Sequence, residues 1–186
     1  MESLKVWVLA AMVTAWLSIG KLVGITPVDV ALAIAQASIE KPLYEGPEGA
    51  LRTASLLTAV GVYESGFDNK AKGDCKDKPP GWPGCGKDND SVPTSFCFLQ
   101  VHFIDGVTKV KGYTPEELMA DPINCARAGR EIMRDSLLEH KKRIKENPEA
   151  VSEPLLQYAG TGTQARRRFE LARKLFKDVP YSIRCD

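Results

Sequence analysis

The sequence lacks the features of several functional classes. Its 25 Lys and Arg residues nearly balance 24 Asp and Glu residues, so a net charge of +1 gives no broad cationic surface for non-specific nucleic-acid binding. The only histidines, His102 and His140, accompany no Gly-x-Ser-x-Gly sequence and no cysteine signature, which argues against a serine or cysteine triad. The sequence contains no Cys-x-x-Cys pair, which argues against a zinc ribbon and against a redox centre. No residue pattern predicts a cofactor or a bound metal ion.

What the chain does contain is the composition of one globular domain. Of its 186 residues, 44% are apolar and 26% are charged, which is enough apolar material for a core. There is no internal repeat and no low-complexity linker, so we expect one folded domain and a monomer. Five cysteines are many for a chain of this length and favour an oxidising compartment.

The N-terminal segment carries the longest apolar run. Val6 to Gly20 contains no charged residue and is flanked by Lys5 and Lys21. These fifteen residues are fewer than the roughly 20 of a membrane span and suit the apolar region of a signal peptide. With the cysteine content, this favours residues 1–21 as a signal peptide and a periplasmic or extracellular location. Two alternatives stay open: a membrane anchor through residues 6–20, and a first helix buried in the fold.

Helix start signals divide the remaining chain into mostly helical segments. Thr26-Pro27 predicts a helix that ends near Pro42, and residues 50–66 predict a second one. Further starts are a capping box at Thr114–Glu117, an N-cap and proline at Asp121-Pro122 that open a helix to about Glu146, prolines 148 and 154, and a last helix over 164–176. The basic side chains of that last helix, Arg166, Arg167, Arg168, Arg173 and Lys174, predict a solvated face or one attracted to an anionic surface.

Residues 67–96 form a different, irregular region. Gly, Pro, Asp, Lys and Cys dominate it, which predicts loops and a short hairpin. The apolar run that follows, residues 96–104, fits either a strand or the start of a buried helix.

Glu64 is the side chain with the most chemical interest. It lies in the final turn of the second helix, where the helix dipole disfavours a carboxylate, and on the same face as Leu57 and Val60, where burial also disfavours it. Both effects favour the protonated acid, which is what a general acid needs.

Three blocks of sequence around Glu64 resemble the soluble lytic transglycosylase family of the lysozyme-like superfamily. The first block is Glu64-Ser65-Gly66-Phe67 and the loop after it. The second, Ser95-Phe96-Cys97-Phe98-Leu99-Gln100, resembles Ser-x-Gly-Leu-x-Gln, with Cys97 where the family usually has Gly. The third, Gln157-Tyr158-Ala159-Gly160, resembles Ala-Tyr-Asn-x-Gly without its Asn.

The resemblance implies a mainly α, lysozyme-like α+β fold over residues 26–186, with an irregular loop lobe beside the cleft. It implies a peptidoglycan lyase that cleaves the β-1,4 bond between N-acetylmuramic acid and N-acetylglucosamine, with Glu64 as the single catalytic acid and base and 1,6-anhydro ends as product. Gln100, Tyr158 and Ser65 would line or support the site. Phe67 and Trp82 are candidates to stack on sugar rings.

Two alternatives remain beside this interpretation. A lysozyme-type hydrolase would need a second carboxylate, and the irregular region offers Asp68, Asp74, Asp88 and Asp90. A non-catalytic cell-wall-binding or structural module of a secretion or phage particle would keep the fold without turnover.

The cysteines predict crosslinks in and beside the irregular region. Cys75 and Cys85 bracket a short loop and are the favoured pair, and Cys97 with Cys125 would tie the second block to the long helix, with Cys185 left over.

Overall fold

The computed structural model describes residues 2–18, 28–75, 93–104, 107–146, 155, 158, 162–180 and 183. Six helices and three short strands occupy these ranges. The helices are α1 (Glu2–Ser18), α2 (Val28–Glu40), α3 (Gly49–Glu64), α4 (Pro115–Ala120), α5 (Pro122–Glu146) and α7 (Gly162–Lys177). The strands are β1 (Lys72–Cys75), β2 (Pro93–Phe96) and β3 (Val101–His102). The described chain is therefore mainly helical with a small sheet, as the sequence predicts.

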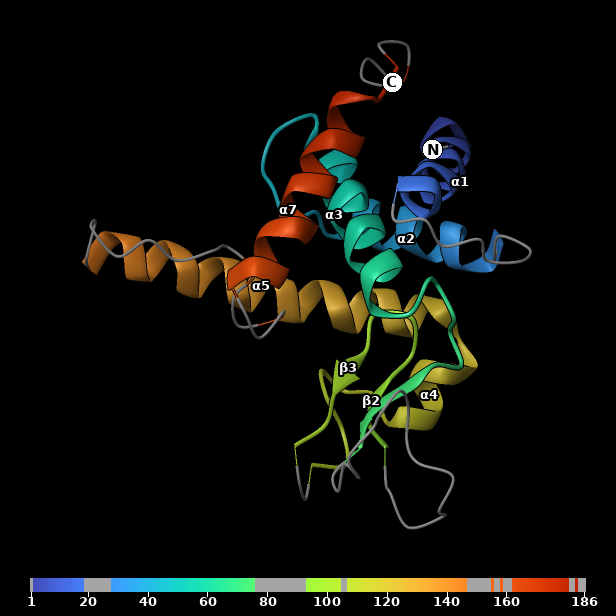
Figure 1. The fold of residues 1–186 in the computed structure, drawn as a ribbon, viewed down its shortest axis with the longest axis vertical. Helices are drawn as coiled ribbons and strands as arrows, with labels where there is room; N and C mark the ends of the chain where they lie inside the picture. Colours follow the sequence, from blue (N-terminus) through green and yellow to red (C-terminus); the bar gives the residue numbers. More distant parts are fainter. Residues whose placement is uncertain are drawn as a thin grey trace.

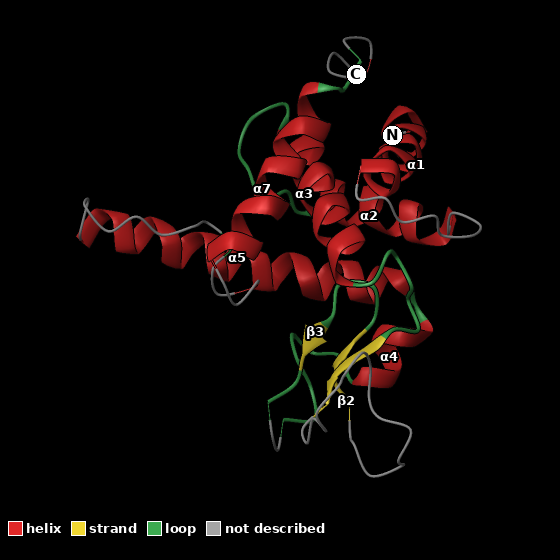
Figure 2. Cartoon of the chain, in the orientation of Figure 1, coloured by secondary structure: helices red, strands yellow, loops and turns green. Residues whose placement is uncertain are grey.

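Helix α5 separates two regions of different character. Helices α1, α2, α3 and α7 cluster on one side of it, and α4 and the strands lie on the other (Figure 1). Figure 2 shows the strands confined to the second side. We call the first side the helical region and the second the sheet region. Glu64 ends α3 where the chain passes from one region to the other.

Helix α3 forms the centre of the helical region. It packs against α7, α1 and α2, and most of its length is buried, Leu57 and Val60 included. Its sequence is rich in Gly, Ala, Ser and Thr, whose small side chains let neighbouring helices approach closely. The buried hydroxyls of Thr53 and Ser55 each donate a hydrogen bond of 2.8 Å to the carbonyl four residues earlier, so burial costs them little.

Helix α1 packs on this centre along one face. Its buried residues recur at helical spacing, namely Leu4, Trp7, Val8, Ala11, Met12 and Ala15. The opposite face is exposed, with Val6 at 63% and Leu17 at 69%. In the structure this segment thus has the form of the buried first helix, whereas its removal as a signal peptide stays a prediction. No helix within the described ranges is long and apolar enough to cross a membrane.

The capping signals set the starts of α4 and α5 as predicted. The Thr114 hydroxyl accepts a hydrogen bond from the Glu117 amide, and the Glu117 carboxylate accepts one from the Thr114 amide. The Asp121 carboxylate accepts a 3.0 Å hydrogen bond from the Ile123 amide at the start of α5. The short helices expected after prolines 148 and 154 start outside the described residues.

The sheet is antiparallel, with β2 in the middle. Lys72 pairs with Phe96, and Ser95 pairs with both Gly73 and His102. The hairpin expected in the irregular region is confirmed as far as the β1–β2 pair, and residues 76–92 lie outside the description. The apolar run after it is neither one strand nor a helix: β2 ends at Phe96, residues 97–100 form a turn, and β3 follows.

Candidate functional site

Glu64 is the last residue of α3, and the chain turns sharply after it. The amides of Ser65, Gly66 and Phe67 all donate to the Gly61 carbonyl, at 3.2, 3.1 and 3.4 Å. Gly66 and Phe67 both have positive φ, 67° and 68°, and this turn folds the Phe67 ring back under the helix end. Gly61 makes that packing fit, because a Cβ there would lie 2.9 Å from the Phe67 ring.

Phe67 is fully buried in this turn. The expectation that its ring stacks on a sugar is therefore wrong, since the ring fills the space beneath α3. The other stacking candidate, Trp82, lies outside the described residues.

The Glu64 carboxylate is held by Arg168 of α7. Arg168 donates a 2.9 Å hydrogen bond from Nε to Glu64 Oε1, and its Nη2 forms an ion pair with the same oxygen at 2.8 Å; the Arg168 side chain is 10% exposed and that of Glu64 is 18% exposed. Arg168 is itself fixed in place, because Nη1 donates to the Gln164 carbonyl at 3.1 Å and its guanidinium lies 5.4 Å from the centre of the Tyr63 ring. At 2.8–2.9 Å from the Glu64 carboxylate, the Arg168 guanidinium favours the charged form of that carboxylate. It thus opposes burial and the helix dipole, which both favour the protonated form.

Arg168 is the site residue that sequence reasoning missed. It was expected on a solvated basic face, and that expectation is wrong, because Arg168 is 8% exposed. A signal was present: Ala165, Arg168, Ala172 and Leu175 follow one another at helical spacing, and the other three are apolar. A single cation within an apolar stripe indicates a buried acidic partner.

Ser65 joins the end of α3 to the second sequence block. Its hydroxyl donates a 2.9 Å hydrogen bond to the Phe98 carbonyl and accepts one of 3.1 Å from the Asp68 amide. Asp68 is exposed and its carboxylate accepts a hydrogen bond from the Lys70 amide, as turn residues commonly do. Of the other aspartates, Asp88 and Asp90 and the side chain of Asp74 lie outside the description.

The turn over residues 97–100 is held in an unusual conformation. Cys97 has a φ of 65° and Gln100 a φ of 50°, both in the left-handed region that favours glycine. A disulfide joins Cys97 to Cys125 of α5, with the Cα atoms 6.1 Å apart. Cys97 therefore has a backbone conformation that suits glycine, and the disulfide ties this position covalently to α5. The Cys75–Cys85 pair lies outside the described side chains.

Gln100 folds back onto its own turn. Its amide nitrogen donates a 2.9 Å hydrogen bond to the Cys97 carbonyl. Its amide oxygen lies so close to Gly73 of β1 that a Cβ there would overlap it. In this arrangement Gln100 stabilises the turn, and a contact with substrate stays a prediction.

Tyr158 connects the third block to the same place. Its hydroxyl donates a hydrogen bond to the Leu99 carbonyl. Burial raises the pKa of the Tyr158 hydroxyl well above its ordinary value, and the Glu64 charge raises it further while Arg168 lowers it. Tyr158 is thus a protonated hydrogen-bond donor, and it lies close enough to Glu64 and Arg168 for both charges to affect its pKa.

Comparison with known proteins adds no relative. No family model matches this chain, and no curated protein or solved structure gives a significant match. Within the described ranges, no three acidic, histidine or cysteine side chains gather as a metal site.

Proposed function

We propose that this chain is a lytic transglycosylase with a lysozyme-like fold, which cleaves the β-1,4 bond between N-acetylmuramic acid and N-acetylglucosamine in peptidoglycan. The observation that carries the proposal is the meeting of three distant blocks around one acid. The Ser65 hydroxyl bonds to the Phe98 carbonyl, and the Tyr158 hydroxyl bonds to the next carbonyl, that of Leu99. The three blocks that resemble the family by sequence are therefore hydrogen-bonded to one another beside Glu64.

The surroundings of Glu64 support an acid and base role. Its side chain is mostly buried yet 18% exposed, so a sugar oxygen can reach it from solvent. It ends a long buried helix beside a small antiparallel sheet, an arrangement that agrees with a lysozyme-like α+β fold. The only other carboxylate described in this loop, Asp68, is engaged in its own turn, which favours chemistry with a single carboxyl group.

The proposed reaction needs one carboxyl group and no water. Glu64 first donates its proton to the glycosidic oxygen as the bond between this oxygen and C1 breaks, and the substrate's N-acetyl group stabilises the cation at C1. The Glu64 carboxylate then takes the proton of the muramic 6-hydroxyl while the oxygen of that hydroxyl bonds to C1. The products are the released chain and a 1,6-anhydro end, and Glu64 has regained its proton.

Arg168 supports the second step of this reaction. Its hydrogen bond and its ion-pair contact fix one carboxylate oxygen and stabilise the charged form that must accept the proton from the 6-hydroxyl. For the first step Glu64 must be protonated, and this weakens the contact with Arg168. The Arg168–Glu64 contact is therefore strong when Glu64 acts as the base and weaker when Glu64 acts as the acid.

Mass spectrometry of the products of purified peptidoglycan tests the proposal. The full chain should be used, because α1 packs on α3 and truncation would expose that buried face. Wild type should release 1,6-anhydromuramyl fragments, and Glu64→Gln should lower their yield at least about a hundredfold, the usual scale for a lost acid. Glu170→Gln is the matched control, because Glu170 is exposed on α7.

Other products would change the conclusion. Reducing-end fragments that disappear in Glu64→Gln would make the enzyme a hydrolase of the same bond. No fragments from folded wild-type protein would overturn the enzymatic proposal in favour of a binding or structural module.

A further inference from the structure

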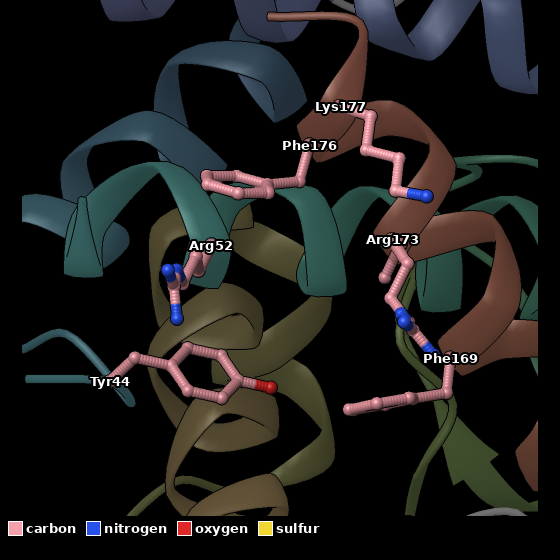
Figure 3. Close-up of a pocket in the computed structure, with 7 residues that line it drawn as sticks. Tyr44, Arg52, Phe169, Arg173, Phe176 and Lys177 are labelled. Atoms are coloured by element: carbon pink, nitrogen blue, oxygen red, sulfur yellow. The ribbon is translucent and has the colours of Figure 1, made fainter. Parts of the chain in front are cut away.

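A cavity of about 360 Å³ lies between α3, α7 and the segment that leads into α3 (Figure 3). Its size is within the range of pockets that bury small organic ligands. Three cationic and three aromatic side chains line it, namely Arg52, Arg173, Lys177, Tyr44, Phe169 and Phe176. None of the residues assigned to the Glu64 site takes part in this lining, so the cavity is separate from that site.

The charged side chains that line this cavity are all cationic. Its lining contains three cations and no carboxylate. Arg52 is held over the Phe176 ring, 5.1 Å from the ring centre, and its Nη2 lies 3.1 Å from the Glu48 carboxylate, outside the lining. Arg173 forms no ion pair within the described part of the chain. An anion would therefore find at least one uncompensated guanidinium here.

Tyr44 adds a neutral hydrogen-bond donor. Burial raises the pKa of Tyr44 to about 12, with a smaller opposing effect of Arg52, so the hydroxyl stays protonated at neutral pH. The described residues provide no hydrogen-bond partner for this hydroxyl, and Figure 3 shows it directed toward the α7 side of the cavity. A polar group in such a position is best satisfied by a ligand or a water molecule.

The aromatic rings define the rest of the ligand. Phe169 and Phe176 are partly buried and stand on the α7 wall of the cavity. Their ring surfaces provide an apolar lining next to the cations, and a simple inorganic anion would leave this lining uncovered. The lining thus combines the requirements of an anionic head and an apolar body.

We propose that this cavity binds an amphiphilic organic anion. Its phosphate, carboxylate or sulfonate group contacts Arg52, Arg173 and Tyr44, and its alkyl or aromatic body lies against Phe169 and Phe176. Such an anion can come from two sources, a free amphiphile or an anionic lipid within a bilayer.

Isothermal titration calorimetry of the full chain with octyl phosphate, below its micelle concentration, tests this site. We expect saturable binding of octyl phosphate and none of octanol. Arg173→Glu/Lys177→Glu should weaken binding at least tenfold, whereas Arg167→Glu/Lys174→Glu, the same charge change at exposed positions on α7, should change it less than twofold. Tyr44→Phe should weaken binding severalfold without a change in helix content. Glu64→Gln should bind as wild type does, which separates this test from that of the proposed function.

Cosedimentation with phosphatidylglycerol vesicles distinguishes the two sources. Sedimentation that is lost in Arg173→Glu/Lys177→Glu (the cavity pair) and kept in Arg167→Glu/Lys174→Glu (the control pair) identifies a bilayer lipid. Binding of octyl phosphate without sedimentation identifies a free amphiphile. No binding of octyl phosphate to wild type, or equal losses in the cavity pair and the control pair, would overturn the proposal.

Discussion

The two regions on either side of α5 hold their parts of the candidate site by different means. In the helical region, Glu64 is positioned by a long buried helix and by one ion pair within the α3–α7 interface. In the sheet region, the turn over residues 97–100 is positioned by hydrogen bonds and by a disulfide to α5. Apolar packing contributes in both regions, because Phe98 and Leu99 of this turn are fully buried. The helical region is held by continuous buried helix faces, whereas the turn also holds two non-glycine residues at positive φ, and hydrogen bonds and a covalent link fix them there.

This difference predicts that the sheet region depends most on its covalent link. The Cys97–Cys125 disulfide spans 28 residues, and in the chain-entropy picture its loss lowers the free energy of unfolding by about 3–4 kcal/mol. We expect this loss in Cys97→Ala/Cys125→Ala, measured by urea unfolding. Because Cys97 has a φ of 65°, Cys97→Gly/Cys125→Ala should be about 1 kcal/mol more stable than the double alanine variant. Equal stability of the two variants would contradict a strained backbone at this position.

The second prediction concerns the ion pair of the helical region. Arg168→Gln leaves the mostly buried Glu64 carboxylate without its cation, and we expect a loss of about 2 kcal/mol in unfolding free energy. Adding Glu64→Gln should restore part of this loss, because the uncompensated charge is then gone. Arg167→Gln, at an exposed position on the same helix, should cost less than 0.5 kcal/mol, which is roughly the spread of surface substitutions.

Arg168→Gln should also change the pH dependence of the proposed activity. Without Arg168 the protonated acid is less disfavoured, so the decline of the initial rate with rising pH should move to higher pH. Additive losses in the double-mutant cycle, together with an unchanged pH profile, would show that Arg168 and Glu64 are not coupled.

The comparison also explains what could be predicted from the sequence. Helix starts follow from local chemistry, so the capping box at Thr114 and the proline after Asp121 predict α4 and α5 correctly. The placement of Glu64 at a helix end beside apolar neighbours could be predicted because both are local properties, whereas its catalytic role stays a prediction. The Glu64–Arg168 partnership joins residues 104 apart, and only the packing of α3 on α7 brings them together.

The sheet region is less predictable than the helical region because fewer local sequence signals determine its structure. Its apolar run, residues 96–104, gives no period that separates strand from helix, and it turns out to contain a turn between two strands. The positive φ of Cys97 contradicts the usual preference of a non-glycine residue. Because Cys97 stands where the resembled motif has Gly, this backbone conformation could not be predicted from the sequence, although the sequence did offer the Cys97–Cys125 pair that accompanies it.

The smallest expected effect lies at the contact between α2 of the helical region and α5. Arg127 of α5 donates from Nε and Nη2 to the Glu40 carboxylate of α2, at 2.9 and 2.6 Å. These hydrogen bonds are the main reason that the pKa of Glu40 is lowered to about 2. A carboxyl group with a lowered pKa stabilises the fold above its unfolded-state pKa of 4.5, and this contribution is lost as the pH falls toward 2.

We therefore expect Glu40→Gln to lower the free energy of unfolding at pH 7 by less than about 1 kcal/mol, because both side chains are 34% exposed and solvent screens the pair. In urea unfolding, the difference from wild type should shrink between pH 5 and pH 3. The Glu139–Arg143 pair, which lies within α5 and joins no two elements, provides the matched control, and Glu139→Gln should cost about 0.3–0.5 kcal/mol. A Glu40→Gln loss that stays constant from pH 7 to pH 3 would place its origin in packing, and the α2–α5 contact would then be held as the rest of the helical region is.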